Sequence, residues 1–440
     1  MDILIQASQF FLSLSILIVL HEFGHFFAAK SFGMRVESFY LFFNPYFSLV
    51  KKKIGDTVYG IGWVPLGGYV KIAGMIDESM DKEQMAKPAE PWEFRSKPAW
   101  QRLIVMIGGV TVNVILAALI YWMVLFVYGE TYLPTKNVKY GIMCDSLALE
   151  MGLQNGDKIL SLDGREIENF SKVPMEIILN EVKTIQVERN GAMVDVQIPD
   201  GMMSELIKAP GLISVRIPFY VEKFTPGSVA KEAGFEKGDQ IVGLNDSTIM
   251  FFDAFKAALQ EYKGQEVIVN VLREGEAKSI AVSVPEDGLL GVYPKGDLSE
   301  FFELAEIKYG FFESFPKGIE KAGQTLVNYV KQLKLLFSPS NKGYESLGGF
   351  LTIGSIFTTS WDWHHFWNIT AFLSVLLAVM NILPIPALDG GHVMFLLYEM
   401  ITGRPANEKV LEVAQVIGMV LLFSLLLFAN GNDIYKHFFK

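Results

Sequence analysis

The sequence contains few cysteines and no excess of basic residues, and each shortage excludes a class of protein. Cys144 is the only cysteine among 440 residues, so no intramolecular disulfide can form. The 38 basic residues are outnumbered by 48 acidic ones, and the formal charge of -10 argues against nucleic acid as a partner. With 51% apolar and 20% charged residues, the chain is neither disordered nor collagen-like.

Charged residues are missing from four long apolar stretches. Each lacks Asp, Glu, Lys and Arg over a length able to cross ~30 Å of hydrocarbon, for which about 20 helical residues are needed. The stretches are residues 3–20, 103–129, 363–388 and 413–432, and we expect the first helix to continue to about residue 29. It has neither a basic leader nor a small-residue cleavage site, so we interpret it as a retained helix. The sequence therefore predicts a polytopic α-helical membrane protein with four transmembrane helices.

The basic residues of the connecting segments predict its orientation. Residues 30–102 carry eleven Lys and Arg side chains, including the consecutive Lys51, Lys52 and Lys53. Short loops rich in basic residues face the cytoplasm. The insertion between the second and third helices, residues 130–362, is then expected on the opposite side of the membrane, together with both termini.

The insertion contains a sequence repeat with a constant offset of 82 residues. In each copy a short helix ends at a glycine, and a Gly-Asp pair then turns the chain into an apolar strand. The pattern resembles that of bacterial PDZ domains and predicts two PDZ-like α+β domains, at 130–208 and 209–285. Two unrelated turns of similar sequence are the alternative. The matching residues are Ser146, Ala148, Gly152, Gly156, Asp157 and Ile159 in the first copy, and Ser228, Ala230, Gly234, Gly238, Asp239 and Ile241 in the second.

A linker, residues 286–362, follows the repeats. Its apolar residues recur at helical spacing and predict an amphipathic helix that lies on the membrane surface or packs against the second repeat. The uncharged, glycine-rich run at 346–361 is short for a membrane span and is expected to be interfacial. The residues that define the helical face are Ile319, Ala322, Leu326, Val330, Leu333 and Phe337.

The first apolar helix ends in an H-E-x-x-H motif, His21-Glu22-Phe23-Gly24-His25. Histidines four residues apart lie on one helix face and can share a Zn²⁺ ion, and Glu22 would then take a proton from the attacking water. Ionisable groups in a transmembrane helix are costly and usually functional. The alternative is that the motif only marks the end of the span in interfacial water.

A zinc site needs a third protein ligand, for which we weighed three residues. Glu37 follows a glycine in a segment that reads as the exit of a helix. Asp389 is the only acidic or basic residue in the 36 residues from 363 to 398, and the third span descends to the side where the first helix ends. Asp389 is therefore the preferred ligand, and His392 is expected to support the site or to pack.

Two asparagines in the spans can bind substrate or hold helices together. Asn381 precedes Pro384 and Pro386, which interrupt the helix, and such breaks line cavities in membrane proteins. Asn381 is predicted to hydrogen-bond a scissile carbonyl, with helix-helix contact as an equal alternative. Asn113 in the second span shows the same ambiguity, and for it helix-helix contact is favoured.

The cytoplasmic segment contains a β-rich stretch at 57–71. We interpret it as a hairpin that returns towards the site and offers the backbone of Gly67, Gly68, Tyr69 and Val70 to an extended substrate. An ordinary cytoplasmic hairpin is the alternative.

Taken together, these motifs resemble the site-2 protease family of intramembrane zinc metalloproteases. The resemblance rests on H-E-x-x-H in the first span, N-x-x-P-x-P-x-L-D-G in the third, a P-L-G-G-Y-V loop between them and two PDZ-like repeats. It implies that His21, His25 and Asp389 bind Zn²⁺, that Glu22 is the catalytic base, and that Asn381 helps to hold the substrate.

The resemblance also implies a location and substrates. The location is a bacterial inner membrane, with the active site towards the cytoplasm and the PDZ-like domains periplasmic. The substrates are single-span membrane proteins such as anti-sigma factors or signal-peptide remnants, cut in regulated intramembrane proteolysis. One departure concerns the second span, where many relatives have G-P-x-x-N and this chain has Val110 after Gly109. The rival hypothesis is a non-catalytic PDZ scaffold in the membrane, held by a structural zinc.

Overall fold

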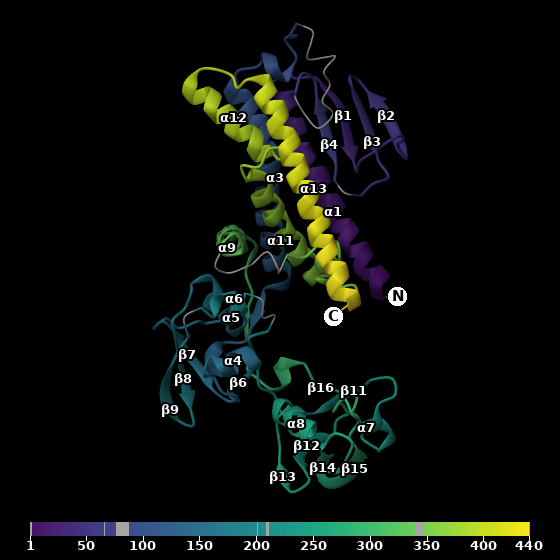
Figure 1. Cartoon of the computed structure of the whole chain (residues 1–440), viewed down its shortest axis with the longest axis vertical. Coiled ribbons are helices and arrows are strands. Elements are labelled where there is room, and N and C mark those ends of the chain that lie inside the picture. The colour runs from purple at the N-terminus through teal and green to yellow at the C-terminus, as the bar shows by residue number, and fades with distance from the viewer. Residues whose placement is uncertain are drawn as a thin grey trace. The chain divides into compact units, whose positions relative to one another are not determined.

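The computed structural model describes residues 2–65, 67–75, 88–199, 201–207, 211–338 and 347–439. Its contacts divide the chain into two compact units (Figure 1). The first unit, called the membrane unit here, comprises Met1–Gly129, Lys308–Lys334 and Ser346–Lys440. The second, called the insertion unit, comprises Glu130–Ile307 and Leu335–Glu345.

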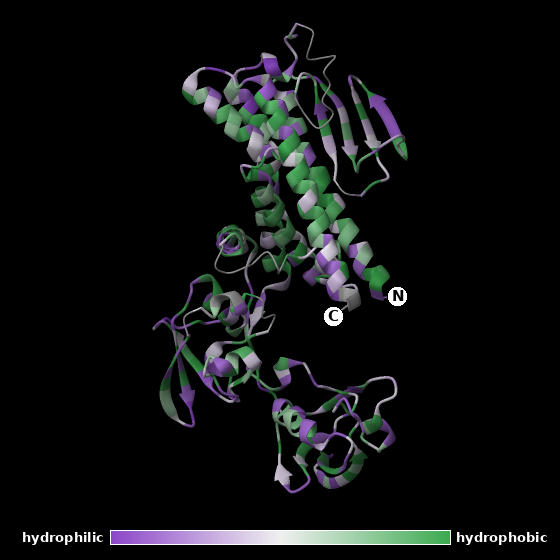
Figure 2. Ribbon diagram, in the orientation of Figure 1, coloured by the Kyte–Doolittle hydropathy of each residue, from purple (hydrophilic) through white to green (hydrophobic). Residues whose placement is uncertain are grey.

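Four helices within the described residues are long and apolar enough to cross a membrane, as the sequence predicts. Figure 2 shows hydrophobic residues along their length. They are α1 (Asp2–Ser31), α3 (Ala99–Tyr128), α11 (Trp363–Ile382) and α13 (Glu408–Phe439).

The largest differences from the predicted boundaries are in the third and fourth spans. The third helix ends at Ile382 instead of residue 388, because Pro384 and Pro386 cannot continue a helix, and a further helix, α12 (Asp389–Thr402), starts at Asp389. The fourth helix runs from Glu408 to Phe439 instead of from residue 413 to residue 432, because a helix does not need to end where its residues become charged.

Helix α3 contacts α1, α11 and α12 in the middle of the bundle. It lies close to α1, because a Cβ atom added to Gly24 would lie 2.3 Å from the carbonyl oxygen of Gly108. Ser13 of α1 and Thr370 of α11 form a buried hydrogen bond of 3.0 Å. Small residues and short polar side chains therefore bring the helices together, as is usual for helices that pack in a membrane.

A four-stranded sheet follows α1, in the order β2-β3-β1-β4. Its strands are β1 (Val36–Leu41), β2 (Val50–Ile54), β3 (Thr57–Ile61) and β4 (Tyr69–Ile72). The predicted hairpin over 57–71 is wrong, because β1 lies between β3 and β4 and pairs with both, parallel to β3 and antiparallel to β4. The hairpin is formed instead by β2 and β3.

The insertion unit holds two hydrophobic cores, one for each sequence repeat. The first core includes Leu212 and Ile213 and the second includes Leu290, so the domain ends predicted at residues 208 and 285 are both too early. The elements up to the change of core are β5 (Glu130–Tyr132), β6 (Ile142–Cys144), α4 (Ser146–Glu150), β7 (Lys158–Leu162), α5 (Val173–Leu179), β8 (Thr184–Arg189), β9 (Ala192–Gln197), α6 (Met203–Leu206) and β10 (Ile213–Val215).

The remaining elements of this unit are again short strands and short helices. They are β11 (Val221–Phe224), α7 (Val229–Glu232), β12 (Gln240–Leu244), β13 (Ser247–Thr248), α8 (Phe252–Leu259), β14 (Glu266–Arg273), β15 (Glu276–Ser283), β16 (Val292–Pro294) and β17 (Ala305–Ile307). Strands β5 and β17 pair with each other, so the beginning and the end of the insertion lie side by side.

Each of the two repeats contains its own buried ion pair, at equivalent positions, which the sequence pattern alone does not reveal. Arg189 donates hydrogen bonds to Asp157 in the first repeat, and Arg273 donates to Asp239 in the second. Each arginine also donates to the carbonyl of the glycine five residues before its aspartate. The aspartate of the Gly-Asp turn is therefore a structural residue in both copies.

The amphipathic helix α9 (Phe311–Leu336) packs on α3, within the membrane unit. Trp122 donates a hydrogen bond of 3.0 Å to the carbonyl of Phe311, and a Cβ atom on Gly318 would lie 2.5 Å from the Trp122 backbone nitrogen. The sequence leaves the membrane surface and the second repeat open for this helix, and its described contacts are with α3. After α9, the short helix α10 (Phe350–Ser355) is held to α13 by hydrogen bonds from Thr352 to Asp433.

Candidate metal centre

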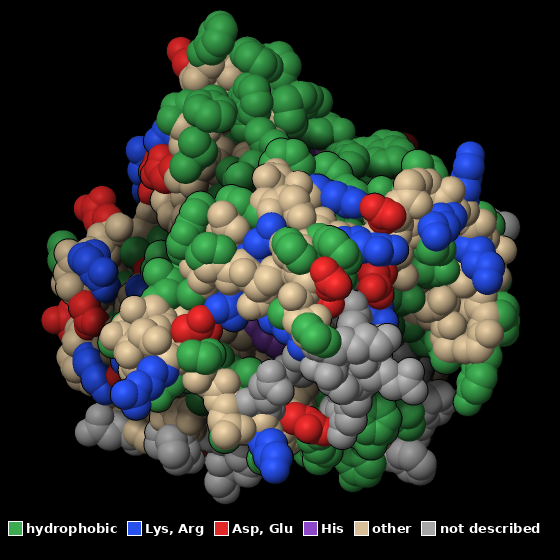
Figure 3. Space-filling model, turned by 90° about the horizontal axis from the view of Figure 1, so that it is seen from above, with side chains coloured by type: hydrophobic (Ala, Val, Ile, Leu, Met, Phe, Trp, Pro, Cys, Tyr) green, Lys and Arg blue, Asp and Glu red, His purple; other side chains and the backbone are tan. Residues whose placement is uncertain are grey.

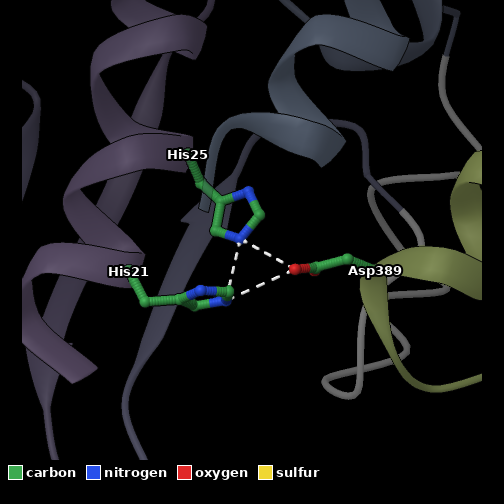
Figure 4. A group of neighbouring side chains, drawn as sticks. All are labelled: His21, His25 and Asp389. Carbon is green, nitrogen blue, oxygen red and sulfur yellow. Dashed lines mark hydrogen bonds and ion pairs between the residues drawn. The ribbon is translucent and has the colours of Figure 1, made fainter. Parts of the chain in front are cut away.

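Helices α1 and α12 bring two imidazoles and one carboxylate together (Figure 4). His21 and His25 lie one turn apart on α1, with their Nε2 atoms 3.3 Å from each other. The Oδ2 atom of Asp389 lies 3.3 Å from each of these nitrogens. Both histidines are more than nine-tenths buried. The three atoms form a triangle whose centre a metal ion can occupy.

Helix α3 orients both imidazoles through contacts with their Nδ1 atoms. The Nδ1 atom of His25 donates to the carbonyl oxygen of Val105 at 2.8 Å, which leaves Nε2 of the neutral ring as an acceptor. The Nδ1 atom of His21 lies 3.0 Å from the amide of Asn113, a residue that is fully buried. Asn113, for which the sequence leaves the role open, therefore contacts a candidate ligand as well as linking helices.

A glycine makes this arrangement possible. A Cβ atom added to Gly109 of α3 would lie 2.4 Å from Nε2 of His25 and 2.6 Å from Cε1 of His21. Real Cβ atoms do not come so close to their neighbours, so only glycine leaves room for the two rings. The valine at position 110 leaves these contacts intact.

The turn before α12 aims Asp389 at the histidines. Ala387 has a φ angle of 78°, a left-handed conformation that is strained for a residue with a Cβ atom. Gly390 has no space for a side chain, because a Cβ atom would lie 2.1 Å from the carbonyl oxygen of Leu383. The Pro-rich segment therefore folds back over the first turn of α12 and fixes the direction of the carboxylate.

The donor set fits a divalent metal such as zinc. Oδ2 of Asp389 is buried, and no described residue donates a hydrogen bond to it. When the ring of His25 is neutral and donates through Nδ1, the nitrogen that faces Asp389 carries a lone pair. This lone pair and the carboxylate oxygen, 3.3 Å apart, repel each other unless a cation lies between them. Two imidazoles and one carboxylate also match the ligand preference of zinc and leave a coordination position open.

Next to the triangle is a cavity of about 600 Å³. Its lining includes Glu22, Asp389 and His392. Figure 3, which looks onto one end of the molecule, shows histidine side-chain atoms within a hollow of that face. Polar groups and water can therefore reach the side of the triangle where Glu22 lies.

The β-rich segment reaches this cavity, although its topology differs from the prediction. Gly68, Tyr69 and Val70 line the cavity, and a Cβ atom on Gly68 would lie 3.4 Å from Cγ of Glu22. Gly67 is not part of the lining, and its Cα faces the ring of Phe43. The structure thus brings three of the four predicted loop residues to the site.

The remaining candidates take other places. The amide of Asn381 lies 3.2 Å from Nε2 of His21 and does not line the cavity. Glu37 forms an ion pair with Lys71 and is not part of the metal-binding group. His392 lines the cavity without joining that group.

Two residues of this region were not foreseen. Gly109 was noted only as part of a motif, because nothing in a sequence shows how close a backbone comes to a side chain. Gln415 of α13 lines the cavity and is 6% exposed. A signal for it existed, because a polar amide within a predicted membrane span is unusual.

Comparison with known proteins gives full-length similarity. The sequence profile described as Peptidase family M50 matches residues 9–425. A protein of Haemophilus influenzae named "Regulator of sigma E protease" is 31% identical over 460 residues, covering 99% of this chain and all of the relative. "Regulator of sigma-E protease RseP" of Escherichia coli is 29% identical, covering 97% of both chains. A "Putative zinc metalloprotease" of Vibrio cholerae is 28% identical and covers 98% of this chain and 99% of its own.

Proposed function

Because the chain belongs to peptidase family M50 and is a metalloprotease, we propose that it is a zinc endopeptidase that cleaves peptide bonds within the membrane-spanning segments of single-span proteins. The observation that carries the proposal is the triangle of His21, His25 and Asp389 beside a cavity lined by Glu22, in a unit of membrane-spanning helices.

In this proposal His21, His25 and Asp389 hold the zinc ion. Bound there, zinc would supply a Lewis acid for the scissile carbonyl and lower the pKa of a water molecule. Glu22 takes the proton from the attacking water and passes it to the leaving amine. Val105 and Asn113 hold the two imidazoles in place by contacting their Nδ1 atoms, so the rings keep Nε2 turned towards Asp389.

The substrate has to be unwound before it can be cut, because a transmembrane helix hides its amides in internal hydrogen bonds. Strand β4, last in the order of its sheet, carries Tyr69 and Val70 on the cavity wall. An extended peptide can add to it as a further strand. Gly68 lets the loop itself lie against α1 beside Glu22, because a Cβ atom there would be 2.6 Å from Cγ2 of Ile18, and with Gly67 it would offer its backbone to that peptide. Asn381 supports the site through its contact with His21.

We further propose that the protein lies in a bacterial inner membrane with residues 30–102 in the cytoplasm and the insertion in the periplasm. The eleven basic residues of the loop support this orientation. Two relatives are named as regulators of sigma E, which supports anti-sigma factors as substrates, with signal-peptide remnants as the other single-span class. Lipid surrounds the spans.

The insertion unit has a proposed role as a filter. Two globular domains joined by the chain directly to the second span would exclude a substrate with a bulky exported domain and admit a trimmed one. Because β5 and β17 pair, residues 133–304 can be replaced by a short glycine linker. This deletion should raise cleavage of an untrimmed substrate and change cleavage of a trimmed one little. Equal loss of both rates would show that the domains recruit substrate instead.

The rival hypothesis, a scaffold stapled by structural zinc, is less well supported. Structural zinc sites are closed by four protein ligands, whereas the described residues bring three together beside an open cavity. The test is to incubate the detergent-purified protein with single-span peptides, with and without a zinc chelator. Cleavage that stops with the chelator and returns with added zinc supports the protease, and chelator-induced unfolding without any cleavage supports the scaffold.

A further inference from the structure

Gln415 is a buried amide on α13, a helix whose other side chains mostly face outward. Its exposed fraction is 6%, whereas its neighbours Val416 and Ile417 are 42% and 61% exposed. It lines the same cavity as Glu22 and Asp389. Within the part of the chain that the structure describes, its side chain makes no hydrogen bond. The amide atoms are open to the cavity, so a group that fills the cavity has to hydrogen-bond them or leave them unpaired at a cost of about 1–3 kcal/mol.

Backbone contacts fix where this amide lies. Gly418, one turn further along α13, approaches Pro386 so closely that a Cβ atom would lie 1.8 Å from the proline carbonyl oxygen. Gln415 and Gly418 share a helix face, because residues three apart lie above each other. Helix α13 is therefore in contact with the segment that leads to Asp389, and Gln415 borders the cavity at that contact.

Strand β4 forms another part of the cavity wall. Val70 lines it from this strand, whose hydrogen-bonded partner among the described strands is β1. An extended peptide that pairs with β4 turns half of its backbone groups towards β4 and the other half away from it. In a cavity between membrane helices, a peptide group without a partner costs several kcal/mol. The far side of the peptide therefore needs a donor and an acceptor.

We propose that Gln415 supplies them, and that its side-chain amide hydrogen-bonds the backbone of the unwound substrate on the side that faces away from β4. Oε1 accepts from a substrate N–H, and Nε2 donates to a substrate carbonyl. The contact recognises the backbone of the substrate and not its side chains. It therefore favours substrate segments that unwind easily, whatever their sequence. This inference rests on the proposed protease function, because it needs a peptide in the cavity.

The test measures binding, so that it does not depend on turnover. The probe is a synthetic single-span peptide with a central Gly-Gly pair, bound to the zinc-loaded, full-length Glu22→Gln protein in detergent. A set of peptides replaces one central amide at a time by an ester, which removes a single N–H. Each peptide is titrated against Glu22→Gln with and without the additional substitution Gln415→Leu, and zinc content is measured for every protein.

Gln415→Leu should weaken binding of the all-amide peptide about tenfold at unchanged zinc content. At one ester position the loss should be about tenfold when Gln415 is present and should vanish in the protein that carries Gln415→Leu, which identifies the paired N–H. Val416→Leu, on the outward face, is the matched control and should leave every value unchanged.

The proposal would be contradicted if Gln415→Leu did not weaken peptide binding. It would also be contradicted if, at every ester position, the loss of affinity from the ester were the same with and without Gln415→Leu. Cleavage by the protein with Glu22 intact is recorded separately. Coupling without cleavage would overturn the protease function alone, and cleavage without coupling would overturn the role of Gln415 alone.

Discussion

Gly109 and His25 lie so close that a single methyl group cannot be placed between them, since a Cβ atom at position 109 would be 2.4 Å from Nε2 of the imidazole. The candidate metal centre therefore depends on three helices, although only α1 and α12 supply the candidate ligands. Gly109, which is not itself a candidate metal ligand, thus allows α3 to lie this close to α1.

Gly109→Ala should reduce zinc retention at least tenfold, because the methyl group would push both imidazoles out of line with Asp389. Gly431→Ala in α13 is the matched control, since a Cβ atom there has no neighbour within 4 Å. Zinc content after dialysis against a weak chelator measures the difference. Full retention of zinc by Gly109→Ala would mean that α3 moves away without affecting the site.

Asp389→Asn and His392→Ala should differ in their metal content. The amide at position 389 has no negative charge for the cation, so both zinc and cleavage should fall by at least tenfold. His392 lines the cavity outside the metal-binding group, so His392→Ala should keep one zinc per chain. Elemental analysis of the purified proteins separates the two, and the reverse pattern would make His392 the third ligand.

Val70→Pro should impair cleavage more than Val70→Ala. Both variants shorten the side chain, but proline also removes a backbone N–H from the strand that lines the cavity. We expect a loss of about tenfold or more for proline and a smaller one for alanine. Similar rates for the two variants, with both shown to be folded and zinc-loaded, would limit β4 to a structural role.

The Asp239 and Arg273 pair should make the second repeat sensitive to acid. Burial alone would raise the pKa of Asp239, but hydrogen bonds from Arg273 and from the Glu236 backbone outweigh it and lower the pKa. A lowered pKa contributes stability above the unfolded value of ~3.9, and this stability is lost as the pH falls below it. Asp239→Asn should therefore destabilise the repeat by about 1–3 kcal/mol at pH 7 and by progressively less as the pH falls from ~3.9 through the lowered pKa of Asp239. Pulse proteolysis across pH measures the effect, with the exposed Asp246→Asn as control.

The sequence predicts much of the site because its signals are local. His21 and His25 follow from helical spacing, and Asp389 follows from being the only carboxylate in a long apolar run. The sheet is different, because β1 reaches its place between β3 and β4 through pairs such as Phe39 with Val70, and neighbouring residues do not encode such distant pairs. Pro384 and Pro386 predict a break in the helix after Ile382, but only the structure shows that a new helix, α12, starts at Asp389. Gln415 carries no charge, so the charge pattern that marks the fourth span does not single it out.

The central claim is that Glu22 performs proton transfer at a zinc site it does not help to hold. The most direct measurement compares cleavage of one single-span peptide by the wild type and by Glu22→Gln, at zinc contents determined on the same samples. We expect one zinc per chain in both proteins and a rate about 10²–10⁴-fold lower in the variant, because the glutamine side chain keeps the shape and loses the base. Loss of zinc from Glu22→Gln, or cleavage at the rate of the wild type, would contradict the account.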